Sequence, residues 1–396
     1  MTPKTFYPRL LLCLCLSGLL FSCGEDRIEL TKSEYTAEEY AVLSKTLNLP
    51  LEGINFKVKL PAHLINRTKI PLIHNQKATL GAVLFYDTKL SANNSISCAS
   101  CHKQSIAFSD DVSFSKGFYG ELTKRNSLAL ASAINVEMSY NMSKAFDGKE
   151  RSAFFFWDER ANSIEEQIKM TLQDKIEMGI NLEELPEKLG KEDYYKILFT
   201  KAYGTDEVSM DRITESIEMF IKSFTVGNSR FDEGMNQSRQ PFYDFTNFSS
   251  QENWGKTLFN TNCTNCHSAD FSALVETMAN NGLDLDYADN GLGGLYNIDY
   301  NNGRFKVPFL RNIVLTGPYM HDGRFASLEE VIDHYSEGIQ AHPNLDSRLR
   351  KDLDPNGEPV RMNFTAEEKA ALVAFLNTLT DYDFIQDARF SDPFKK

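Results

Sequence analysis

Two short stretches of the chain place a pair of thiols beside an imidazole, CASCH at 98–102 and CTNCH at 263–267. Two cysteines at this spacing can form thioether bonds to a porphyrin, while the following histidine reaches the iron from one face. A redox disulfide or half of a zinc site is the alternative for such a pair. The complete pattern occurs twice, which favours two covalently attached c-type haems. The residues that would hold them are Cys98, Cys101, His102, Cys263, Cys266 and His267.

The N-terminus has the pattern of an export signal. Residues 1–22 contain Lys4 and Arg9, then an apolar run, and Ser22 precedes Cys23. The run is too short to span a membrane comfortably, and residues 20–24 resemble a bacterial lipobox. We therefore expect a lipid on Cys23, with an ordinary signal peptide as the alternative. The protein would then be periplasmic, or a cell-envelope lipoprotein held to the membrane by its lipid anchor only.

The chain is acidic, with a formal net charge of −13 over 396 residues. Loss of Lys4 and Arg9 with the signal would change this to −15 (−13 − 2). Such a charge argues against binding to nucleic acid and favours a basic partner, for example a small electron-donor protein. A surface that is acidic only for solubility is the alternative. Whether two chains pair as a homodimer is left open by the sequence.

Helix signals surround both cysteine pairs, so we expect a mainly α-helical fold. The motif GxxLF precedes each pair, at 81–85 and 255–259, as expected if one haem-binding helical unit occurs twice. Capping boxes predict helix starts at Thr36, Ser163, Ser249, Ser327 and Thr365. The expected organisation is a signal peptide (1–22), a tether with one short helix (23–60), a first haem domain (61–240) and a second haem domain (241–396).

The chemistry of each haem depends on the face opposite its histidine. A filled sixth position favours electron transfer, whereas an open one admits a small oxidant. No histidine follows the first pattern before residue 248, so the first haem is expected to be open unless His74 folds back onto it.

An ordered series of motifs from about residue 80 to residue 382 resembles the bacterial di-haem cytochrome c peroxidase superfamily, which includes the maturase MauG. The motifs are LGAVLFYDTKLS at 80–91, AFSD at 107–110, RNS at 125–127, FWDER at 156–160, EEQ at 165–167, EM at 177–178, FKVPFLRN at 305–312 and TGPYMHDGR at 316–324. The resemblance implies two cytochrome c-like helical domains, each with one haem c. The first haem would be peroxidatic, the second would transfer electrons, and a calcium ion would lie between the domains.

The resemblance also implies roles for individual residues. Trp157 matches the tryptophan that relays electrons between the haems, although a simple core indole is the alternative. Gln167 and Glu177 match the distal pair of the peroxidatic pocket. A peroxidase needs a group that moves a proton from one peroxide oxygen to the other, and a carboxylate suits this task. Glu159 departs from the glycine that is usual in FWDGR, which puts the backbone geometry near Trp157 in question.

Two further matches concern metals. The resemblance assigns calcium to Asn126 and to the backbone carbonyls of Thr316 and Pro318, and hard oxygen donors suit this ion. On the second iron, Tyr335 stands where many of these peroxidases have methionine, as in the maturase-like branch. Met320 is the alternative ligand, and His334 is a weaker one.

Phe118 stands where peroxidases that need reductive activation have a distal histidine, which favours an open first haem. We therefore expect a peroxidase that reduces hydrogen peroxide to water with electrons from a donor such as a cytochrome c. A MauG-like maturase that oxidises residues of a partner protein is the first alternative. A di-haem electron-transfer protein without peroxide chemistry is the second.

Overall fold

The computed structural model describes residues 33–65, 71–132, 155–272, 275–354 and 356–396. The predicted signal peptide and the predicted lipidation residue Cys23 lie outside this part of the chain. None of the helices within it has the length and apolar character needed to cross a membrane.

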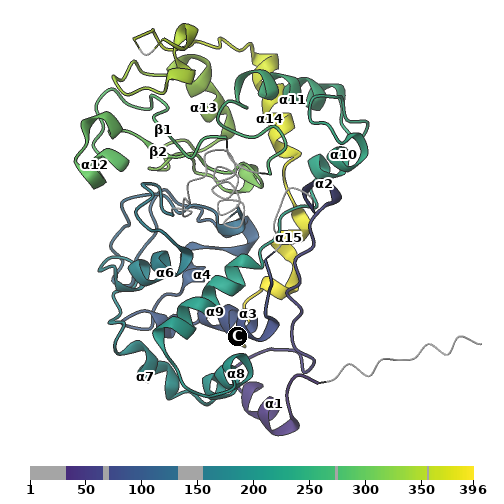
Figure 1. The fold of residues 1–396 in the computed structure, drawn as a ribbon, viewed down its shortest axis with the longest axis vertical. Coiled ribbons are helices and arrows are strands. Elements are labelled where there is room, and N and C mark those ends of the chain that lie inside the picture. Colours follow the sequence, from purple (N-terminus) through teal and green to yellow (C-terminus); the bar gives the residue numbers. More distant parts are fainter. Residues whose placement is uncertain (1–32, 66–70, 133–154, 273–274, 355) are drawn as a thin grey trace, which may run out of the picture.

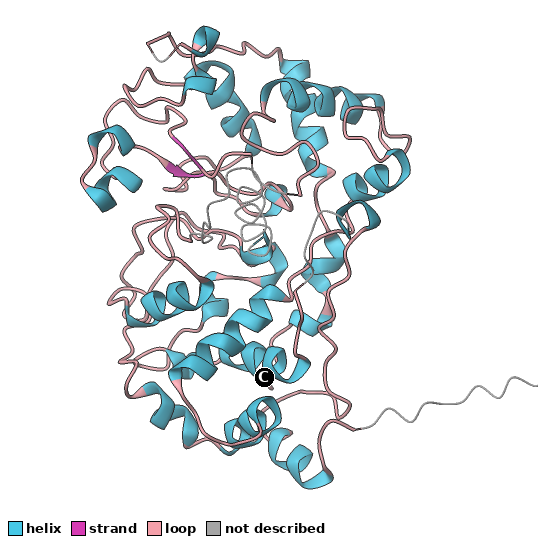
Figure 2. Ribbon diagram, viewed as in Figure 1, coloured by secondary structure: helices cyan, strands magenta, loops and turns pink. Residues whose placement is uncertain are grey.

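The expectation of a mainly helical chain is confirmed, and the described strands form a single two-stranded antiparallel ribbon (Figures 1 and 2). The helices of the lower half of Figure 1 are α1 (Ala37–Leu43), α3 (Asn75–Tyr86), α4 (Cys98–Cys101), α6 (Ile164–Gln173), α7 (Leu185–Gly190), α8 (Asp193–Tyr203) and α9 (Met210–Lys222). The remaining elements are α2 (Ala62–Ile65), α10 (Arg230–Ser238), α11 (Ser250–Asn262), β1 (Met278–Ala279), α12 (Leu292–Tyr296), β2 (Phe305–Lys306), α13 (Leu328–Asp333), α14 (Ala366–Asn377) and α15 (Tyr382–Gln386).

All five predicted helix starts are helix N-caps. Thr36, Ser249 and Thr365 form complete capping boxes with the glutamates three residues later. Ser163 and Ser327 each accept a hydrogen bond from the backbone nitrogen of the corresponding glutamate. These contacts form within one helical turn, which is why the local sequence predicts them.

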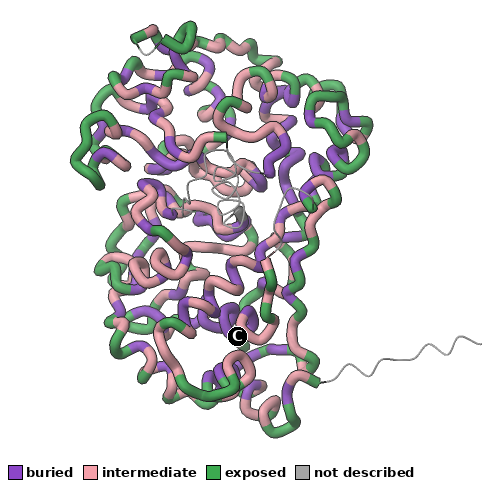
Figure 3. Tube along the Cα trace, in the orientation of Figure 1, coloured by how far each residue is buried: buried purple, intermediate pink, exposed green. Residues whose placement is uncertain are grey.

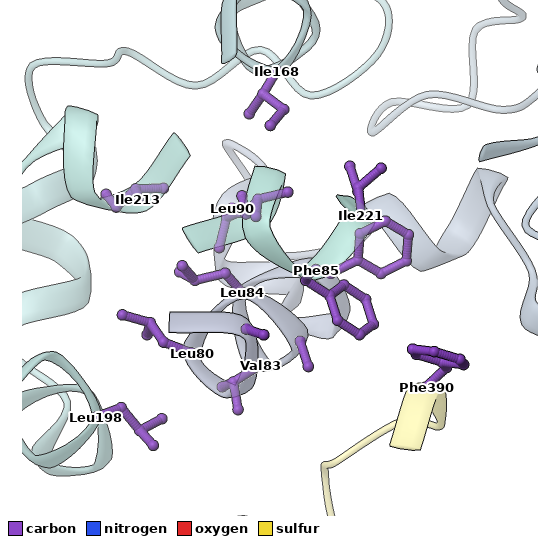
Figure 4. Packing of buried hydrophobic residues seen from close by; sticks show 14 of the residues in the cluster. Leu80, Val83, Leu84, Phe85, Leu90, Ile168, Leu198, Ile213, Ile221 and Phe390 are labelled. Atoms are coloured by element: carbon purple, nitrogen blue, oxygen red, sulfur yellow. The ribbon is translucent and has the colours of Figure 1, made fainter. Parts of the chain in front are cut away.

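Most buried apolar side chains belong to two large cores, one packed against Cys98 and the other against Cys263. The first core gathers side chains of α3, α6, α8 and α9, including Leu84, Phe85 and Ile221 (Figure 4). The second core lies among α10, α11, α13 and α14. Apart from Phe384 and Phe390 near the C-terminus, the first core ends at Val226 in chain order and the second begins at Phe231, which is before residue 240, the predicted domain boundary.

A similar pair of crossing helices lies beside each CxxCH stretch, α3 with α9 and α11 with α14. In α3, a Cβ added to Gly81 would lie 1.9 Å from the backbone oxygen of Ser216 on α9. In α11, a Cβ added to Gly255 would lie 1.8 Å from the backbone oxygen of Ala371 on α14. The repeated GxxLF motif therefore marks two helix crossings at which the backbones touch, and only glycine fits there.

Both ends of the described chain pack on the first core. Leu43 and Phe56 are fully buried in it, so residues 33–60 contain the expected short helix but are not merely a tether. The C-terminal segment, yellow in Figure 1, runs from the upper half of the molecule into the lower half. There Phe390 is buried, and its carbonyl accepts a 2.7 Å hydrogen bond from Tyr86. The C-terminal segment thus links the two halves.

Residues 280–304 are rich in glycine, asparagine and aspartate, a composition typical of a loop, yet they also contain short helical turns. The segment contains α12 and a short 3-10 turn at Asp299–Asn301, and it is flanked by β1 and β2. Its outer part is mostly exposed, as the green tube beside α12 shows (Figure 3). Glycine and asparagine dominate this stretch, which conceals the single helical turn from a periodicity argument.

The two glycine crossings generate a stability prediction. Gly81→Ala and Gly255→Ala should each lower the free energy of unfolding by about 1–3 kcal/mol, because the added methyl overlaps a backbone carbonyl that must shift. Thermal unfolding of the haem-loaded protein, followed by circular dichroism, measures the loss. Gly190→Ala is the matched control, since the nearest atom to its Cβ lies 3.8 Å away. Equal unfolding midpoints for all three variants would contradict the close crossings.

Candidate functional site

The first CxxCH stretch lines a cavity of about 920 Å³, which we call the Cys98 cavity. Helix α4 is one turn long and begins after the N-cap residue Ser97. That turn carries Cys98 and Cys101, with His102 as its C-cap, so all three side chains come from one local structure. The volume is typical of sites for small molecules and cofactors.

The ring of His102 is oriented by a backbone carbonyl. Its Nδ1 lies 2.9 Å from the oxygen of Phe108, and because that oxygen can only accept, Nδ1 carries the proton. Ala107 and Phe108 form the turn in the left-handed region, with φ of 58° and 59°. Burial lowers the pKa of His102, although the Phe108 bond acts in the opposite direction. The ring is therefore neutral and keeps the Nε2 lone pair for a metal.

The second CxxCH stretch lines a separate cavity of about 300 Å³, which we call the Cys263 cavity. Burial lowers the pKa of His267 to about 4, so this ring is also neutral. The carbonyl of Pro308 opposes that shift. Within the described chain Nδ1 of His267 makes no hydrogen bond of regular geometry.

The four cysteines are free thiols in the structure. Burial raises the pKa of Cys98 and Cys263 to about 12, and that of Cys101 and Cys266 to about 11. Among the described residues, no group of three or more His, Cys, Asp or Glu side chains is arranged to hold a metal ion. Paired neutral thiols beside a neutral imidazole on a cavity wall fit a thioether-linked haem at each stretch.

Trp157 forms part of the wall that the two cavities share. Its indole is 9% exposed, and Nε1 donates a 2.8 Å hydrogen bond to the backbone oxygen of Asn126. Its own carbonyl accepts from the backbone nitrogen of Lys306 at 2.8 Å. Trp157 is therefore held in the wall between the two cavities by residues distant in sequence, and its role in connecting the haems stays a prediction.

The question about Glu159 has a structural answer. Glu159 adopts φ of 58°, in the left-handed region that favours glycine and costs other residues about 1–2 kcal/mol. Its Oε1 lies 3.1 Å from Nζ of Lys306, and both side chains are almost fully buried. Burial lowers the pKa of Lys306, and Glu159 opposes this shift. The ion pair holds the backbone after Trp157 in the conformation that glycine adopts elsewhere.

The structure brings the predicted distal pair to the Cys98 cavity. Gln167 lies on α6 and lines both cavities, whereas Glu177 lies in the turn after α6 and lines the Cys98 cavity. Burial raises the pKa of Glu177, and the charge of Asp174 adds to the rise. The Thr171 hydroxyl and the Arg160 charge act in the opposite direction. A carboxyl with a raised pKa at a cavity wall is suited to proton transfer.

Phe118 packs against the turn that carries Glu177. The backbone nitrogen of Phe118 donates to the carbonyl of Glu177 at 3.1 Å. A Cβ on Gly179 would lie 2.3 Å from the Phe118 ring, and one on Gly117 would lie 1.6 Å from the oxygen of Ile176. Phe118 therefore packs against the turn that carries Glu177, and it is not among the described residues that line the Cys98 cavity.

The other histidines are placed away from a distal role at the first haem. His74 is the N-cap residue of α3, and among the described residues that line the Cys98 cavity the histidines are His102 and His321. His321 lies at the wall between the two cavities and stacks on Phe305, with ring centroids 3.7 Å apart. A contact between His321 and a haem propionate stays a prediction.

Tyr335 and Met320 both line the Cys263 cavity, and each lies on unusual backbone. Tyr335 belongs to a π-helical turn, His334–Gly338, and Met320 has φ of 75°. Burial raises the pKa of Tyr335 to about 12. His334 is engaged elsewhere, because its Nε2 lies 3.1 Å from the backbone oxygen of Asn281. Tyr335 and Met320 are thus the candidates for the sixth position that the geometry supports.

The predicted calcium ligands lie near the shared wall. Asn126 lines both cavities, and Thr316 and Pro318 line the Cys263 cavity. The Asn126 amide nitrogen donates to the oxygen of Val112 at 3.1 Å, which fixes the orientation of the side chain. Such a set of neutral oxygens suits calcium, and the assignment stays a prediction.

A network of charges beside the Cys98 cavity was missed at the level of sequence. Arg125 pairs with Asp158 at 2.6 Å and with Asp289 at 2.7 Å, and Arg160 pairs with the other oxygen of Asp158 at 2.9 Å. These residues flank Asn126 and Trp157. The charged residues of the RNS and FWDER motifs, Asp158 included, could have suggested this network, but its third partner, Asp289, comes from a distant part of the chain.

Comparison with known proteins agrees with this arrangement. A family model described as di-haem cytochrome c peroxidase matches residues 75–240. The methylamine utilization protein MauG of Methylorubrum extorquens is 30% identical over 312 residues, which cover 77% of this chain and 78% of that protein. Cytochrome c551 peroxidase of Nitrosomonas europaea is 29% identical, over 76% of this chain and 79% of that protein.

A solved structure supports the same relationship. The crystal structure of a MauG-like protein associated with microbial copper homeostasis has a TM-score of 0.67 and 30% identity, and the match covers 86% of this chain and 98% of that one. The diheme peroxidase BthA from Burkholderia thailandensis, at 20% identity and a TM-score of 0.62, shares the fold. On the combined similarity of sequence, fold and paired haem-binding stretches, the chain belongs to the MauG-like di-haem cytochrome c peroxidase superfamily.

Proposed function

We propose that this chain reduces hydrogen peroxide to water at the haem held by Cys98, Cys101 and His102. The observation that carries the proposal is the position of Glu177, whose carboxyl has a raised pKa and lines the same cavity as that haem-binding stretch. When bound, the haem iron would supply the coordination site and the redox chemistry of the reaction.

The distal residues would manage protons and orientation. The carboxylate of Glu177 takes the proton from one peroxide oxygen and returns it to the other, so that the departing oxygen leaves as water. Gln167 orients the peroxide through its side-chain amide, from a position on the same cavity wall. Ile164 and Ile168, on the same helix, give this part of the wall apolar side chains.

Electrons would enter at the haem held by Cys263, Cys266 and His267 and cross by way of Trp157. The support is the shared wall, because Trp157 lines both cavities and is fixed by its hydrogen bond to Asn126. The net charge of −13 favours a basic donor such as a small cytochrome c. Export, lipidation at Cys23, a periplasmic or cell-envelope location and the calcium ion belong to the same proposal.

A second function is favoured by the side chains of the Cys263 cavity. Tyr335 lines that cavity, and an anionic oxygen ligand would lower the haem potential and stabilise oxidised states. Similarity to MauG proteins at 30% identity agrees with this alternative. In that case the oxidising equivalents from peroxide would be used on a residue of a partner protein. Rapid peroxide consumption with a reduced cytochrome c distinguishes the first function from this one.

The acid–base role of Glu177 can be tested directly. Glu177→Gln should slow the reaction of the oxidised di-haem protein with peroxide by about 10²–10⁴-fold, because the amide cannot move the proton. Stopped-flow absorbance of the haem bands measures this rate. Glu183→Gln is the matched control, since Glu183 is exposed on the following segment. An unchanged rate in Glu177→Gln would exclude the assigned role.

The raised pKa of Glu177 gives the reaction a pH dependence. The carboxylate form accepts the peroxide proton, so the rate should be full above the pKa of Glu177 and should fall as the pH drops through it. Because burial raises this pKa, the fall should occur above the ordinary glutamate value of about 4.3. The bimolecular rate constant measured from pH 4 to pH 9 tests this, and the same limb in Glu177→Gln would assign the titration to another group.

The electron route through Trp157 can be separated from the peroxide reaction. Trp157→Phe should lower turnover with a reduced donor by about tenfold, equivalent to about 1.4 kcal/mol, and should leave the first reaction with peroxide largely unchanged. Steady-state oxidation of a reduced cytochrome c measures turnover. Trp254→Phe is the matched control, because Trp254 is 43% exposed and far from the shared wall in sequence. Equal turnover in both variants would argue against the route.

A further inference from the structure

Asn281 connects the two candidate ligands of the second haem. Its side-chain nitrogen lies 3.4 Å from the hydroxyl oxygen of Tyr335 and 3.5 Å from the sulfur of Met320. Asn281 lines the same cavity as the second CxxCH stretch. An amide nitrogen carries two hydrogens, so one side chain can donate to both atoms.

The position of Asn281 is determined by the turn in which it lies. Its backbone oxygen is the atom that engages Nε2 of His334, at 3.1 Å. Before it, Asn280 donates to the oxygen of Asn302 at 3.0 Å and accepts from the nitrogen of Gly282 at 2.9 Å. After it, the oxygen of Gly282 accepts from the nitrogen of Gln340 at 2.7 Å. These hydrogen bonds fix the backbone at Asn281, and with it the direction in which the side-chain amide leaves the chain.

Tyr335 and Met320, the two residues that Asn281 contacts, both have irregular backbone conformations. Tyr335 lies in a π-helical turn, a feature frequent at functional sites, and Met320 has the left-handed φ of 75°. These two departures from regular backbone bring an oxygen and a sulfur to one amide.

We propose that Asn281 is a positioning residue of the second haem, which directs the Tyr335 oxygen toward the iron and tunes the haem potential by hydrogen bonding to that oxygen. This inference rests on the proposed assignment of the second haem. A hydrogen bond to an anionic oxygen withdraws electron density from it, so a weaker donor faces the iron and the reduced state is favoured. Asn281 thus raises the potential of a haem that tyrosinate alone would hold low.

The test uses the full-length protein with both haems attached and needs no peroxide turnover. Asn281→Ala and Asn281→Leu should shift the reduction potential of the second haem to more negative values, while the first haem keeps its potential and spectrum. Leucine nearly preserves the shape of asparagine without its donors, so a loss of packing in the alanine variant is distinguished from a loss of the hydrogen bond. Spectroelectrochemistry and resonance Raman spectra of the low-spin haem are the readouts.

Two further variants make the result decisive. In a Tyr335→Phe background, Asn281→Leu should cause no additional shift, because the oxygen that it acts on is gone. Asn377→Leu is the matched control and should leave both potentials unchanged, since Asn377 is exposed and donates to Val373 within α14. An unchanged potential in both Asn281 variants would overturn the proposal. A second-haem spectrum that changes in Met320→Leu and not in Tyr335→Phe would overturn it as well. A normal Glu177→Gln rate would instead refute the peroxidase proposal alone.

Discussion

The hydrogen bond between the Trp157 indole and the Asn126 carbonyl is the contact on which the two-centre arrangement depends. At 2.8 Å it ties FWDER to RNS, and the backbone pair between Trp157 and Lys306 ties the same residue to β2. One buried indole therefore belongs to both halves of the molecule and to both cavities. If the indole were free to rotate, its distance and orientation relative to each CxxCH stretch would vary, and an electron route through it would have no fixed geometry.

The same local arrangement surrounds both CxxCH stretches. In each half a glycine permits two helix backbones to touch, a phenylalanine follows within the same GxxLF motif, and a CxxCH turn comes after the first helix. The differences lie on the opposite walls of the cavities. One wall carries Gln167 and Glu177, and the other carries Tyr335 and Met320. Similar helix pairs with different cavity walls are what the proposed function requires, since one haem would react with peroxide while the other would supply electrons.

The sequence predicted what is decided locally. The capping boxes at Thr36, Ser249 and Thr365 form within one helical turn, and so does the turn that carries Cys98 and Cys101. Such local contacts were enough to predict a mainly helical fold. Contacts that join distant segments were not predictable from pattern. The Tyr86 hydroxyl meets the Phe390 carbonyl across 304 positions, and Lys306 meets Glu159 across 147. Gln167 and Glu177 were placed only by resemblance, because an isolated glutamate in a helical sequence is usually a solvated charge.

Glu159 shows why such contacts escape a local argument. Its own residue type opposes a left-handed φ, so the sequence alone indicates a distorted turn after Trp157. The structure keeps the turn because Lys306 supplies a buried partner, and Lys306 is at the same time the residue whose backbone holds Trp157. Lys306 of β2 therefore makes both contacts: its side chain pairs with Glu159, whose backbone is strained, and its backbone nitrogen donates to Trp157. Where FWDGR has a glycine, this chain has Glu159, and its buried ion pair with Lys306 lies beside the indole of Trp157 in the wall between the two cavities.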